Sequence, residues 1–310
     1  MPINALFAAP AANWQTYEQT LRDAFEELSL DVNLSCEFAP EAVDYIVYAP
    51  SSPLQDFTPY SRAKAVLSLW AGVEKITGNP TLKIPLARMV DPGMTMGMIE
   101  WVCGHVLRHH LGMDRHILGQ DGEWLSGYPP LASDRRVTVL GLGELGGAVA
   151  RALAQFGFAV TGWSRSAKEL PGIDTLHGDT GLTEALRRAD ILVLLLPLTA
   201  ATENLLSADR LAQMPKGAFI VNPGRGPLID DDALLAALDS GQIAHATLDV
   251  FRVEPLPRQH PFWAHPGVTV TPHIASETRA KTASRVIAEN IRRGEAGEAF
   301  LHLVDRAAGY

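Results

Sequence analysis

The chain has 310 residues, of which 47% are hydrophobic and 20% are charged, and its formal net charge is -9. This length is sufficient for two domains of ordinary size, and the composition is that of a globular protein. The acidic balance argues against a nucleic-acid partner, because binding to a phosphate backbone needs an excess of basic residues.

Only two cysteines are present, Cys36 and Cys103. They are too few for a disulfide framework and lack the spacing of a zinc site, so the sequence favours a reducing cytoplasm. The first residues lack the basic region of a secretory signal. The longest apolar run, residues 191–196, is too short to cross a bilayer, and no membrane partner is expected.

The first part of the chain shows strand-like apolar runs at residues 3–8, 45–48 and 65–69. An amphipathic, helix-like stretch at residues 14–28 lies between the first two runs. This alternation predicts a small α/β unit.

The second part of the chain repeats the alternation on a larger scale. Strand-like runs occur at residues 137–140, 159–163, 191–195, 218–222, 246–249 and 268–271. Helix-like segments, such as residues 144–156, 182–188 and 231–238, separate them. Nearly continuous apolar strands with helices between them predict a parallel, doubly wound sheet of the Rossmann type.

Two segments connect these parts. Residues 91–97 are loop-like and lead into a long helical stretch at residues 98–111, so we expect the crossover between domains there. A further helix-like stretch, residues 276–293, follows the last strand-like run.

A glycine-rich loop, Gly141-x-Gly143-x-x-Gly146, follows the run at residues 137–140 and opens a helix-like segment. Gly141 is suited to a tight turn, Gly143 to close approach of a pyrophosphate, and Gly146 to close packing of the helix on the sheet. The motif alone is weak, but this context indicates a dinucleotide site.

The segment that follows the next strand-like run carries no acid. An NAD site typically places a carboxylate there to bind the ribose 2′-hydroxyl. This chain has hydroxyls and cations instead, namely Ser164, Arg165, Ser166 and Lys168. Arg165 can bind a 2′-phosphate through its planar guanidinium, so the sequence favours NADPH over NADH. The alternative is a solvated polar turn.

An arginine, a glutamate and a histidine follow three successive strand-like runs. They are Arg225, Glu254 and His273, and the carboxyl ends of parallel strands are where doubly wound folds bind ligands. Each residue alone has a structural alternative: a buried ion pair, a surface acid or a core histidine. Together they predict a site that anchors and protonates a 2-oxo acid during hydride transfer.

The chain resembles the D-isomer-specific 2-hydroxyacid dehydrogenase family over essentially its whole length and, within that family, the glyoxylate/hydroxypyruvate reductase A group. The resemblance is carried by Leu140-Gly-Leu-Gly-Glu-Leu-Gly-Gly, Trp163-Ser-Arg-Ser, Leu196-Pro-Leu-Thr-Ala-Ala-Thr202, Asn222-Pro-Gly-Arg-Gly, Leu248-Asp-Val-Phe-Arg-Val-Glu-Pro-Leu-Pro, Thr271-Pro-His-Ile-Ala and Val304-Asp-Arg-Ala-Ala-Gly-Tyr310.

The resemblance implies a division into domains. It places a discontinuous, flavodoxin-like substrate domain at residues 1–88 and 277–310, and a dinucleotide-binding domain at residues 89–276. Hinges are expected near residues 90–96 and 275–278, where closure would expel water from the reaction. A cytoplasmic homodimer is expected.

The resemblance also implies roles for single residues. His273 would donate the proton, Glu254 would hold the imidazole, and Arg225 would bind the substrate carboxylate and carbonyl oxygen. Substrate-binding positions would be Trp70, Ala71, Gly72, Val73 and Arg225. Cofactor-binding positions would be Gly141, Gly143, Glu144, Leu145, Gly146, Trp163, Ser164, Arg165, Ser166, Lys168, Pro197, Thr202, Pro223, Gly224, Asp249, which would contact the nicotinamide amide, His273 and Ala275.

Two positions depart from the family pattern. Pro223-Gly224 replaces a commoner small pair before Arg225, and Trp70 replaces a smaller residue, which affects the size of substrate that is expected. The expected reaction is NADPH-dependent reduction of glyoxylate or hydroxypyruvate to the D-2-hydroxy acid, with NAD as a second cofactor. The alternatives are a family dehydrogenase for a bulkier 2-oxo acid and a dinucleotide-sensing binding protein of the corepressor type.

No metal site is expected. His105 and His109 have the i, i+4 spacing of two metal ligands on a helix. The sequence offers no third metal-ligating residue with a comparable spacing. The stretch is typical of an exposed helix face.

Overall fold

The structure is a computed structural model that describes residues 2–119, 121–124, 126–306 and 309. The chain forms two compact units, Met1–Met94 with Glu277–Tyr310, and Thr95–Ser276. The first boundary falls between residues 94 and 95, against the expected 88 and 89. Within the described ranges, no helix combines the length and apolar character needed to cross a membrane. Ala307, Ala308 and Tyr310 of the C-terminal motif lie outside the described residues.

The first unit contains a parallel sheet with the strand order β2-β1-β3-β4-β5. The strands are β1 (Ile3–Ala8), β2 (Val32–Ser35), β3 (Tyr45–Tyr48), β4 (Ala65–Ser68) and β5 (Leu86–Ala87). β3 and β4 are buried along their whole length, which explains why they are apolar except for Ser68 at the end of β4.

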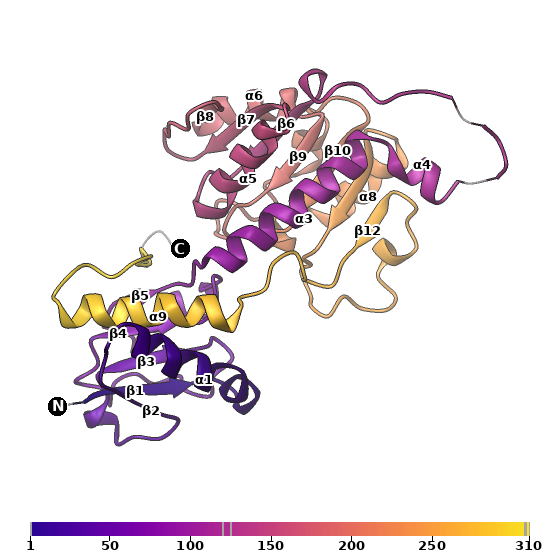
Figure 1. The fold of residues 1–310 in the computed structure, drawn as a ribbon. Coiled ribbons are helices and arrows are strands. Elements are labelled where there is room, and N and C mark those ends of the chain that lie inside the picture. Colours follow the sequence, from indigo (N-terminus) through magenta and orange to yellow (C-terminus); the bar gives the residue numbers. More distant parts are fainter. Residues whose placement is uncertain (1, 120, 125, 307–308, 310) are drawn as a thin grey trace. The chain divides into compact units, whose positions relative to one another are not determined.

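Two long helices of the first unit pack against each other, although they come from opposite ends of the chain. They are α1 (Ala11–Glu27) and α9 (Ala280–Glu295), and Figure 1 shows both beside the sheet. Thr20 and Ser284 share a hydrogen bond of 2.9 Å, and Arg285 forms a bidentate ion pair with Glu27. The segment after residue 276 therefore belongs to the first unit. The short α2 (Glu74–Thr77) and η1 (Pro40–Ala42) complete this unit among the described residues.

The second unit contains a larger parallel sheet with the strand order β12-β11-β10-β9-β6-β7-β8. Its strands are β6 (Arg136–Leu140), β7 (Ala159–Ser164), β8 (Asp174–His177), β9 (Ile191–Leu194), β10 (Ala218–Asn222), β11 (Ile243–Leu248) and β12 (Val268–Val270). The order reverses at β6, and ligands of doubly wound sheets bind outside the carboxyl ends of the strands at such a point.

Helices cover both faces of this sheet. They are α3 (Pro92–His110), α5 (Glu144–Gln155), α6 (Gly178–Arg188), α7 (Ala208–Leu211) and α8 (Asp231–Asp239). The short α4 (Met113–Ile117) follows α3 and has no buried residue. Short 3-10 turns are η2 (Ala132–Asp134), η3 (Gly226–Leu228) and η4 (Pro261–Trp263). The two parallel sheets with their helices confirm the predicted α/β Rossmann-type fold.

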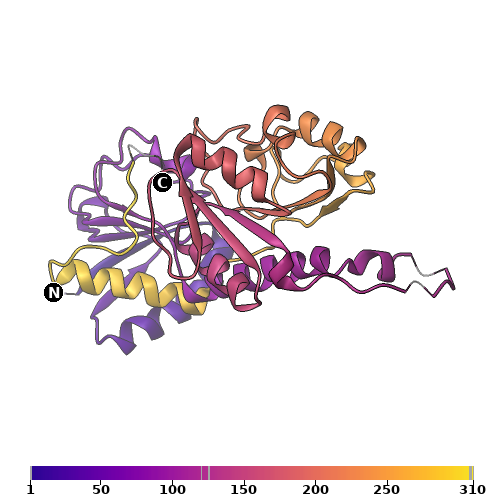
Figure 2. The ribbon, with the colours of Figure 1, turned by 90° about the horizontal axis from the view of Figure 1, so that it is seen from above.

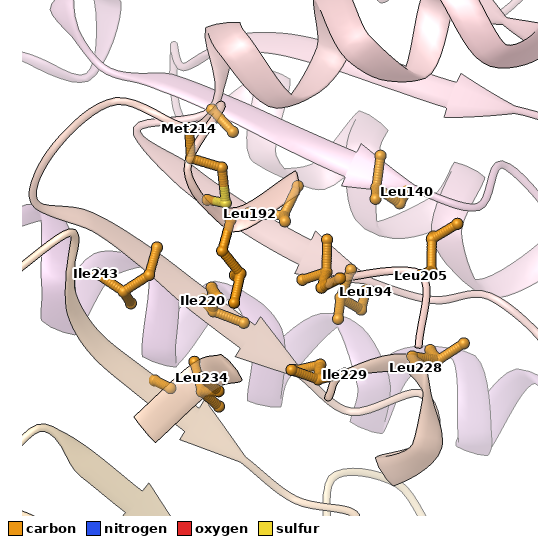
Figure 3. Packing of buried hydrophobic residues seen from close by; sticks show 14 of the residues in the cluster. Leu140, Leu192, Leu194, Leu205, Met214, Ile220, Leu228, Ile229, Leu234 and Ile243 are labelled. Atoms are coloured by element: carbon orange, nitrogen blue, oxygen red, sulfur yellow. The ribbon is translucent and has the colours of Figure 1, made fainter. Parts of the chain in front are cut away.

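Alternating side chains of the strands supply two separate cores. In β9, Leu192 and Leu194 belong to a cluster with α6, α7 and α8, whereas Ile191 and Val193 belong to a cluster with α3 and α5. Figure 3 shows the first cluster around Leu192, Leu194 and Ile220. Full burial of such a side chain contributes about 1.5 to 3 kcal/mol, so both faces of the sheet stabilise the unit.

Three strands were not predicted, namely β2, β5 and β8. Each is short or polar, and β8 reads Asp-Thr-Leu-His. β8 lies at an edge of its sheet and is fixed by parallel pairing with β7. Pairing of this kind depends on the tertiary structure, which a search for apolar runs does not detect.

The start of α3 corrects the prediction of a loop at residues 91–97. The helix begins at Pro92, because Asp91 Oδ1 accepts hydrogen bonds from the amides of Gly93 (2.8 Å) and Met94 (3.1 Å). An aspartate before a proline is typical of a helix N-terminus, where proline is favoured in the first turn.

Candidate active site

The glycine-rich loop connects β6 to α5 and has the geometry that its sequence predicted. Gly141 adopts a φ of 104°, and a Cβ there would lie 2.4 Å from the Leu195 carbonyl oxygen. A Cβ at Gly146 would lie 1.7 Å from the Gly141 carbonyl oxygen, so the helix packs too closely for a larger residue.

Gly143 differs from these two glycines. It precedes the first residue of α5, and a Cβ there would meet no described atom within 4 Å. Packing within the protein therefore does not require a glycine at this position. A glycine would be required at residue 143 if a phosphate closely approached the start of α5, where the amides of Glu144 and Leu145 lie.

The turn that follows β7 lies beside the glycine-rich loop, because the Gly141 amide donates to the Trp163 carbonyl at 2.8 Å. Lys168 Nζ donates to the Leu142 carbonyl at 2.8 Å. The Ser164 hydroxyl donates to the Ser166 carbonyl at 2.7 Å, which folds the turn. Arg165 and Ser166 are exposed. The turn thus presents cations next to the loop and contains no carboxylate between residues 163 and 168.

Trp163 is buried, and its Nε1–H donates to the Gly178 carbonyl at 2.9 Å. Its indole packs in the core with α6. Only the backbone of Trp163 is left for a contact with a ligand. The Thr202 hydroxyl is also used within its own loop, because it donates to the Pro197 carbonyl at 2.7 Å and accepts from the Thr199 amide at 2.8 Å.

The turn after β10 carries Arg225. The buried Asn222 side chain accepts from the Gly224 amide at 3.1 Å and donates to the Arg225 carbonyl at 3.0 Å. Arg225 is half-buried, and its Nη1 donates to the Gly224 carbonyl at 2.8 Å. A Cβ at Gly224 would lie 2.8 Å from the Leu194 carbonyl oxygen, which explains the glycine after Pro223. Asn222 was not among the predicted site residues, although Asn-Pro-Gly is a typical turn signal.

Glu254 and His273 come together from two different strand ends. His273 Nδ1 lies 2.7 Å from Glu254 Oε2, and the other carboxylate oxygen accepts from the Phe251 amide at 2.9 Å. A carboxylate can only accept, so Nδ1 carries the hydrogen and Nε2 is directed to the opposite side of the ring. Both side chains are partly exposed, so a ligand can reach the imidazole.

Arg252 holds the segment that carries Glu254. Its Nη2 donates to the Ile229 carbonyl at 2.7 Å and to Asn204 Oδ1. These contacts join the segment after β11 to the segments after β9 and β10. Arg252 was not among the predicted site residues, because its hydrogen-bond partners are distant in the chain.

In the first unit, the loop after β4 presents Trp70, whose side chain is 38% exposed. The Ser68 hydroxyl accepts from the Trp70 amide at 3.1 Å and donates to its carbonyl at 3.0 Å, so the backbone of Trp70 is held firmly. The amides of Ala71, Gly72 and Val73 donate to no backbone carbonyl in the described part of the chain. Consecutive amides of this kind suit an anion such as a carboxylate.

The structure corrects the expectation that His105 and His109 lie on an exposed helix face. His109 is only 4% exposed, stacks on Phe219 and shares a hydrogen bond of 2.9 Å with Thr247. Burial is the main cause that lowers the pKa of His109 to about 3, and the ring is neutral at pH 7. It is a core histidine, because α3 packs this side against the sheet.

Comparisons with known proteins give consistent results. The family model for the D-isomer specific 2-hydroxyacid dehydrogenase, NAD binding domain, matches residues 102–275. The chain is 38% identical over 279 residues to a glyoxylate/hydroxypyruvate reductase A of Yersinia enterocolitica, covering 87% of this chain and 88% of that protein. It is 39% identical over 276 residues to one of Serratia proteamaculans, covering 86% and 88% of the two chains.

Solved structures are similar over the full length. A D-isomer specific 2-hydroxyacid dehydrogenase from Xanthobacter autotrophicus, in complex with NADPH and MES, has a TM-score of 0.93, 41% identity and complete coverage of both chains. An NADPH-dependent glyoxylate/hydroxypyruvate reductase from Sinorhizobium meliloti, in complex with NADP and sulfate, has a TM-score of 0.83 and 34% identity, and covers 100% of this chain and 99% of that one.

Proposed function

Because this chain belongs to the D-isomer specific 2-hydroxyacid dehydrogenase family, we propose that it reduces glyoxylate or hydroxypyruvate to the D-2-hydroxy acid with NADPH. The observation that carries this proposal is the 2.7 Å contact between His273 and Glu254. It fixes an imidazole beside the carboxyl ends of the strands, where doubly wound folds bind ligands.

Side chains of the protein would stabilise and neutralise the charge that develops on the substrate during the reaction. The nicotinamide cofactor, when bound, would supply the hydride, and this chain's residues would have to stabilise the negative charge on the substrate's carbonyl oxygen. Arg225 would stabilise that charge, and His273 would protonate the oxygen through Nε2. Glu254 would hold the ring through Nδ1, so that Nε2 can face the substrate oxygen.

NADPH is favoured by the turn after β7. Arg165 and Lys168 place two cations within a few residues of the strand end, and a carboxylate that would repel a 2′-phosphate is lacking between residues 163 and 168. Related structures hold NADPH or NADP. The proposed cofactor contacts are the glycine-rich loop with Glu144 and Leu145, the turn at residues 163–168, Pro197, Thr202, Pro223, Gly224, Asp249, His273 and Ala275; NAD is a second, weaker cofactor.

The loop at residues 70–73 is proposed to bind the substrate carboxylate through the amides of Gly72 and Val73. Their lack of carbonyl partners in the described part of the chain supports this role. The indole of Trp70 would limit the size of the substrate, which favours the small acids glyoxylate and hydroxypyruvate over bulkier ones.

The test is a steady-state assay of the purified protein with NADPH and a panel of 2-oxo acids that differ in size. We expect rapid oxidation of NADPH with glyoxylate and hydroxypyruvate and slower oxidation with branched or aromatic acids. Replacement of Trp70 by alanine should reduce this discrimination. A protein that binds NADPH but turns over none of these acids would instead be a dinucleotide-sensing binding protein.

A homodimer is also proposed, and the segment between α4 and β6 supports it. In Figure 1 and Figure 2 the described parts of this segment extend away from the rest of the second unit, and Trp124 and Tyr128 on it are each 96% exposed. A cluster of exposed apolar side chains typically marks an interface, and two-fold dimers are the commonest assemblies. Further exposed apolar side chains in or next to this segment are Leu111, Met113, Ile117, Leu118 and Leu131.

Light scattering after size-exclusion chromatography tests this interface. We expect a dimer for the wild type and a monomer for the double variant Ile117→Ser and Leu118→Ser. Phe156→Ser, which changes an exposed apolar residue at the end of α5, is the control and should remain dimeric. A monomeric wild type would contradict the proposal.

We also propose a cytoplasmic location, because Cys36 and Cys103 are both free thiols.

A further inference from the structure

We propose that Arg306 is a positioning residue that holds the substrate loop, residues 70–73, through contacts with the backbone that follows this loop. The inference rests on the proposed function, because that function gives the loop its role in binding the substrate carboxylate. Arg306 belongs to the motif at residues 304–310, which takes no part in the proposed chemistry.

The guanidinium of Arg306 binds three carbonyl oxygens of one short segment. Nε donates to the Thr77 carbonyl at 2.9 Å, Nη2 to the Asn79 carbonyl at 2.7 Å, and Nη1 to the Leu82 carbonyl. No described backbone amide donates to any of these three oxygens. A planar group with a rigid fork of donors suits such a set of acceptors, so Arg306 fixes the course of residues 77–82.

The short helix α2 connects this segment to the substrate loop. It begins directly after Val73, and the Val73 carbonyl accepts from the amides of Ile76 and Thr77, both at 3.0 Å. A helix of one turn is not stable by itself and depends on tertiary contacts. Because a single turn joins Val73 to Thr77, a shift of the Thr77 carbonyl is transmitted to the end of the substrate loop.

The residues before Arg306 support the other end of the same loop. Leu303 forms an antiparallel bridge with Ala87 of β5, with backbone hydrogen bonds of 2.9 and 3.0 Å on either side. Directly after this pairing, the Met89 amide donates to the Trp70 carbonyl at 3.0 Å. Residues 302–306 therefore support the chain on both sides of the substrate loop.

Burial makes the contacts of Arg306 difficult to replace. Val73, Ile76 and Leu82 are buried and belong to one apolar cluster of the first unit, against which Val304 also packs. A backbone carbonyl beside such a cluster needs a donor from the protein. Without the guanidinium, residues 77–82 would have to rearrange to expose their carbonyls to water, and α2 would move with them.

The position of the loop should affect substrate binding more than the chemical step. The substrate carboxylate does not change during hydride transfer, so the amides of Gly72 and Val73 would bind it equally before and during the reaction. Loss of an interaction of this kind raises KM and leaves kcat nearly unchanged. A general loss of folded protein has the opposite signature, because it lowers the active fraction, and hence the apparent kcat, without changing KM.

Steady-state kinetics at saturating NADPH tests this prediction. We expect Arg306→Ala to raise KM for glyoxylate by about tenfold, to change kcat by less than about threefold and to leave the Kd for NADPH within about twofold of the wild type. Arg306→Lys keeps the charge, but a single ammonium group cannot reproduce the fork of donors. Its KM should lie between those of the wild type and Arg306→Ala.

Arg285→Ala is the matched control in the same unit. It removes a guanidinium that binds Glu27 through two hydrogen bonds of 2.9 Å, and these join α9 to α1. We expect its KM for glyoxylate to equal that of the wild type. If Arg306→Ala lowers kcat at unchanged KM, or if Arg285→Ala raises KM to the same extent, Arg306 only stabilises the unit and the proposal is wrong.

The closing experiment does not depend on turnover. Hydrogen–deuterium exchange of the free, full-length protein is followed by mass spectrometry in peptides that cover α2. We expect exchange there to be about tenfold faster in Arg306→Ala than in the wild type, because local opening becomes easier, and to be unchanged in Arg285→Ala. Unchanged exchange in folded Arg306→Ala would overturn the positioning role. Faster exchange in α2, together with failure of the wild type to reduce any 2-oxo acid, would overturn the proposed function instead.

Discussion

Gly226 lies against the backbone of Phe251 so closely that a Cβ on the glycine would fall 2.1 Å from the Phe251 carbonyl carbon. The two residues link the halves of the candidate site. Gly226 directly follows Arg225, and the Phe251 amide donates to Glu254, which in turn contacts His273. The relative placement of Arg225 and Glu254 therefore depends on the lack of a side chain at residue 226.

The substitution Gly226→Ala should impair catalysis more than stability. The added methyl group has to displace either the turn that carries Arg225 or the segment that carries Glu254, because the contact is with backbone. We expect kcat/KM to fall by about 100-fold or more, as misplacement of about 1 Å can cause. Steady-state kinetics with NADPH and glyoxylate measures the change.

Gly104→Ala is the matched control. A Cβ at Gly104 meets no described atom within 4 Å, and the residue lies within α3. It should keep wild-type kinetics. Its free energy of unfolding should increase by about 0.5 to 1 kcal/mol, because alanine has a higher helix propensity than glycine. Equal kinetics for the two variants would show that the close contact at Gly226 does not position the site.

The cofactor preference should depend on Arg165. A charge-assisted hydrogen bond contributes about 1.5 to 3 kcal/mol, so Arg165→Ala should lower kcat/KM with NADPH by about tenfold or more and change the value with NADH little. Arg187→Ala, which removes an exposed arginine in the last turn of α6, is the charge-matched control. A wild type that prefers NADH would show that the turn after β7 is only a solvated loop.

The buried histidines should make the protein sensitive to acid. Desolvation is the main cause that lowers the pKa of His109 to about 3 and that of His245 to about 4. In the unfolded chain a histidine has a pKa of about 6.5, so between these values the unfolded state binds more protons. The free energy of unfolding should therefore be greatest above pH 6.5 and fall as the pH decreases toward 4, by up to about 1.4 kcal/mol per pH unit for each histidine.

Urea unfolding at pH 7.5 and pH 5.0 tests this dependence. His109→Gln should lose less stability than the wild type between the two pH values, because one buried titrating group is removed. His116→Gln, on the exposed surface of α4, should behave as the wild type does. An identical loss in all three proteins would show that other groups dominate the acid sensitivity.

Features that depend on local sequence could be predicted. The apolar runs of β1, β3, β9 and β10, the turn at Gly141 and the strand ends that carry Arg225, Glu254 and His273 are all visible in the sequence. They follow from the burial of both faces of parallel strands, from the conformational freedom of glycine and from the rule that parallel strands share one carboxyl edge.

Features that depend on tertiary contacts could not be predicted. The face of α3 that carries His109 is buried only because the helix packs on β10 and β11, through Phe219 and Thr247. The hydrogen bonds between Asp249 and the segment that carries His273 likewise depend on how the ends of β11 and β12 meet. The start of α3 is different, because the Asp-Pro signal was present in the sequence.

The most direct test of the account is the rate of NADPH oxidation with glyoxylate and hydroxypyruvate by the wild type and by His273→Ala, measured with the Kd for NADPH of each protein. Loss of a general acid costs about 10²- to 10⁴-fold, and the imidazole acts on the substrate oxygen. The account predicts a fall of that size in kcat with an almost unchanged Kd for NADPH. Near-normal turnover by His273→Ala between pH 6 and pH 8 would contradict it.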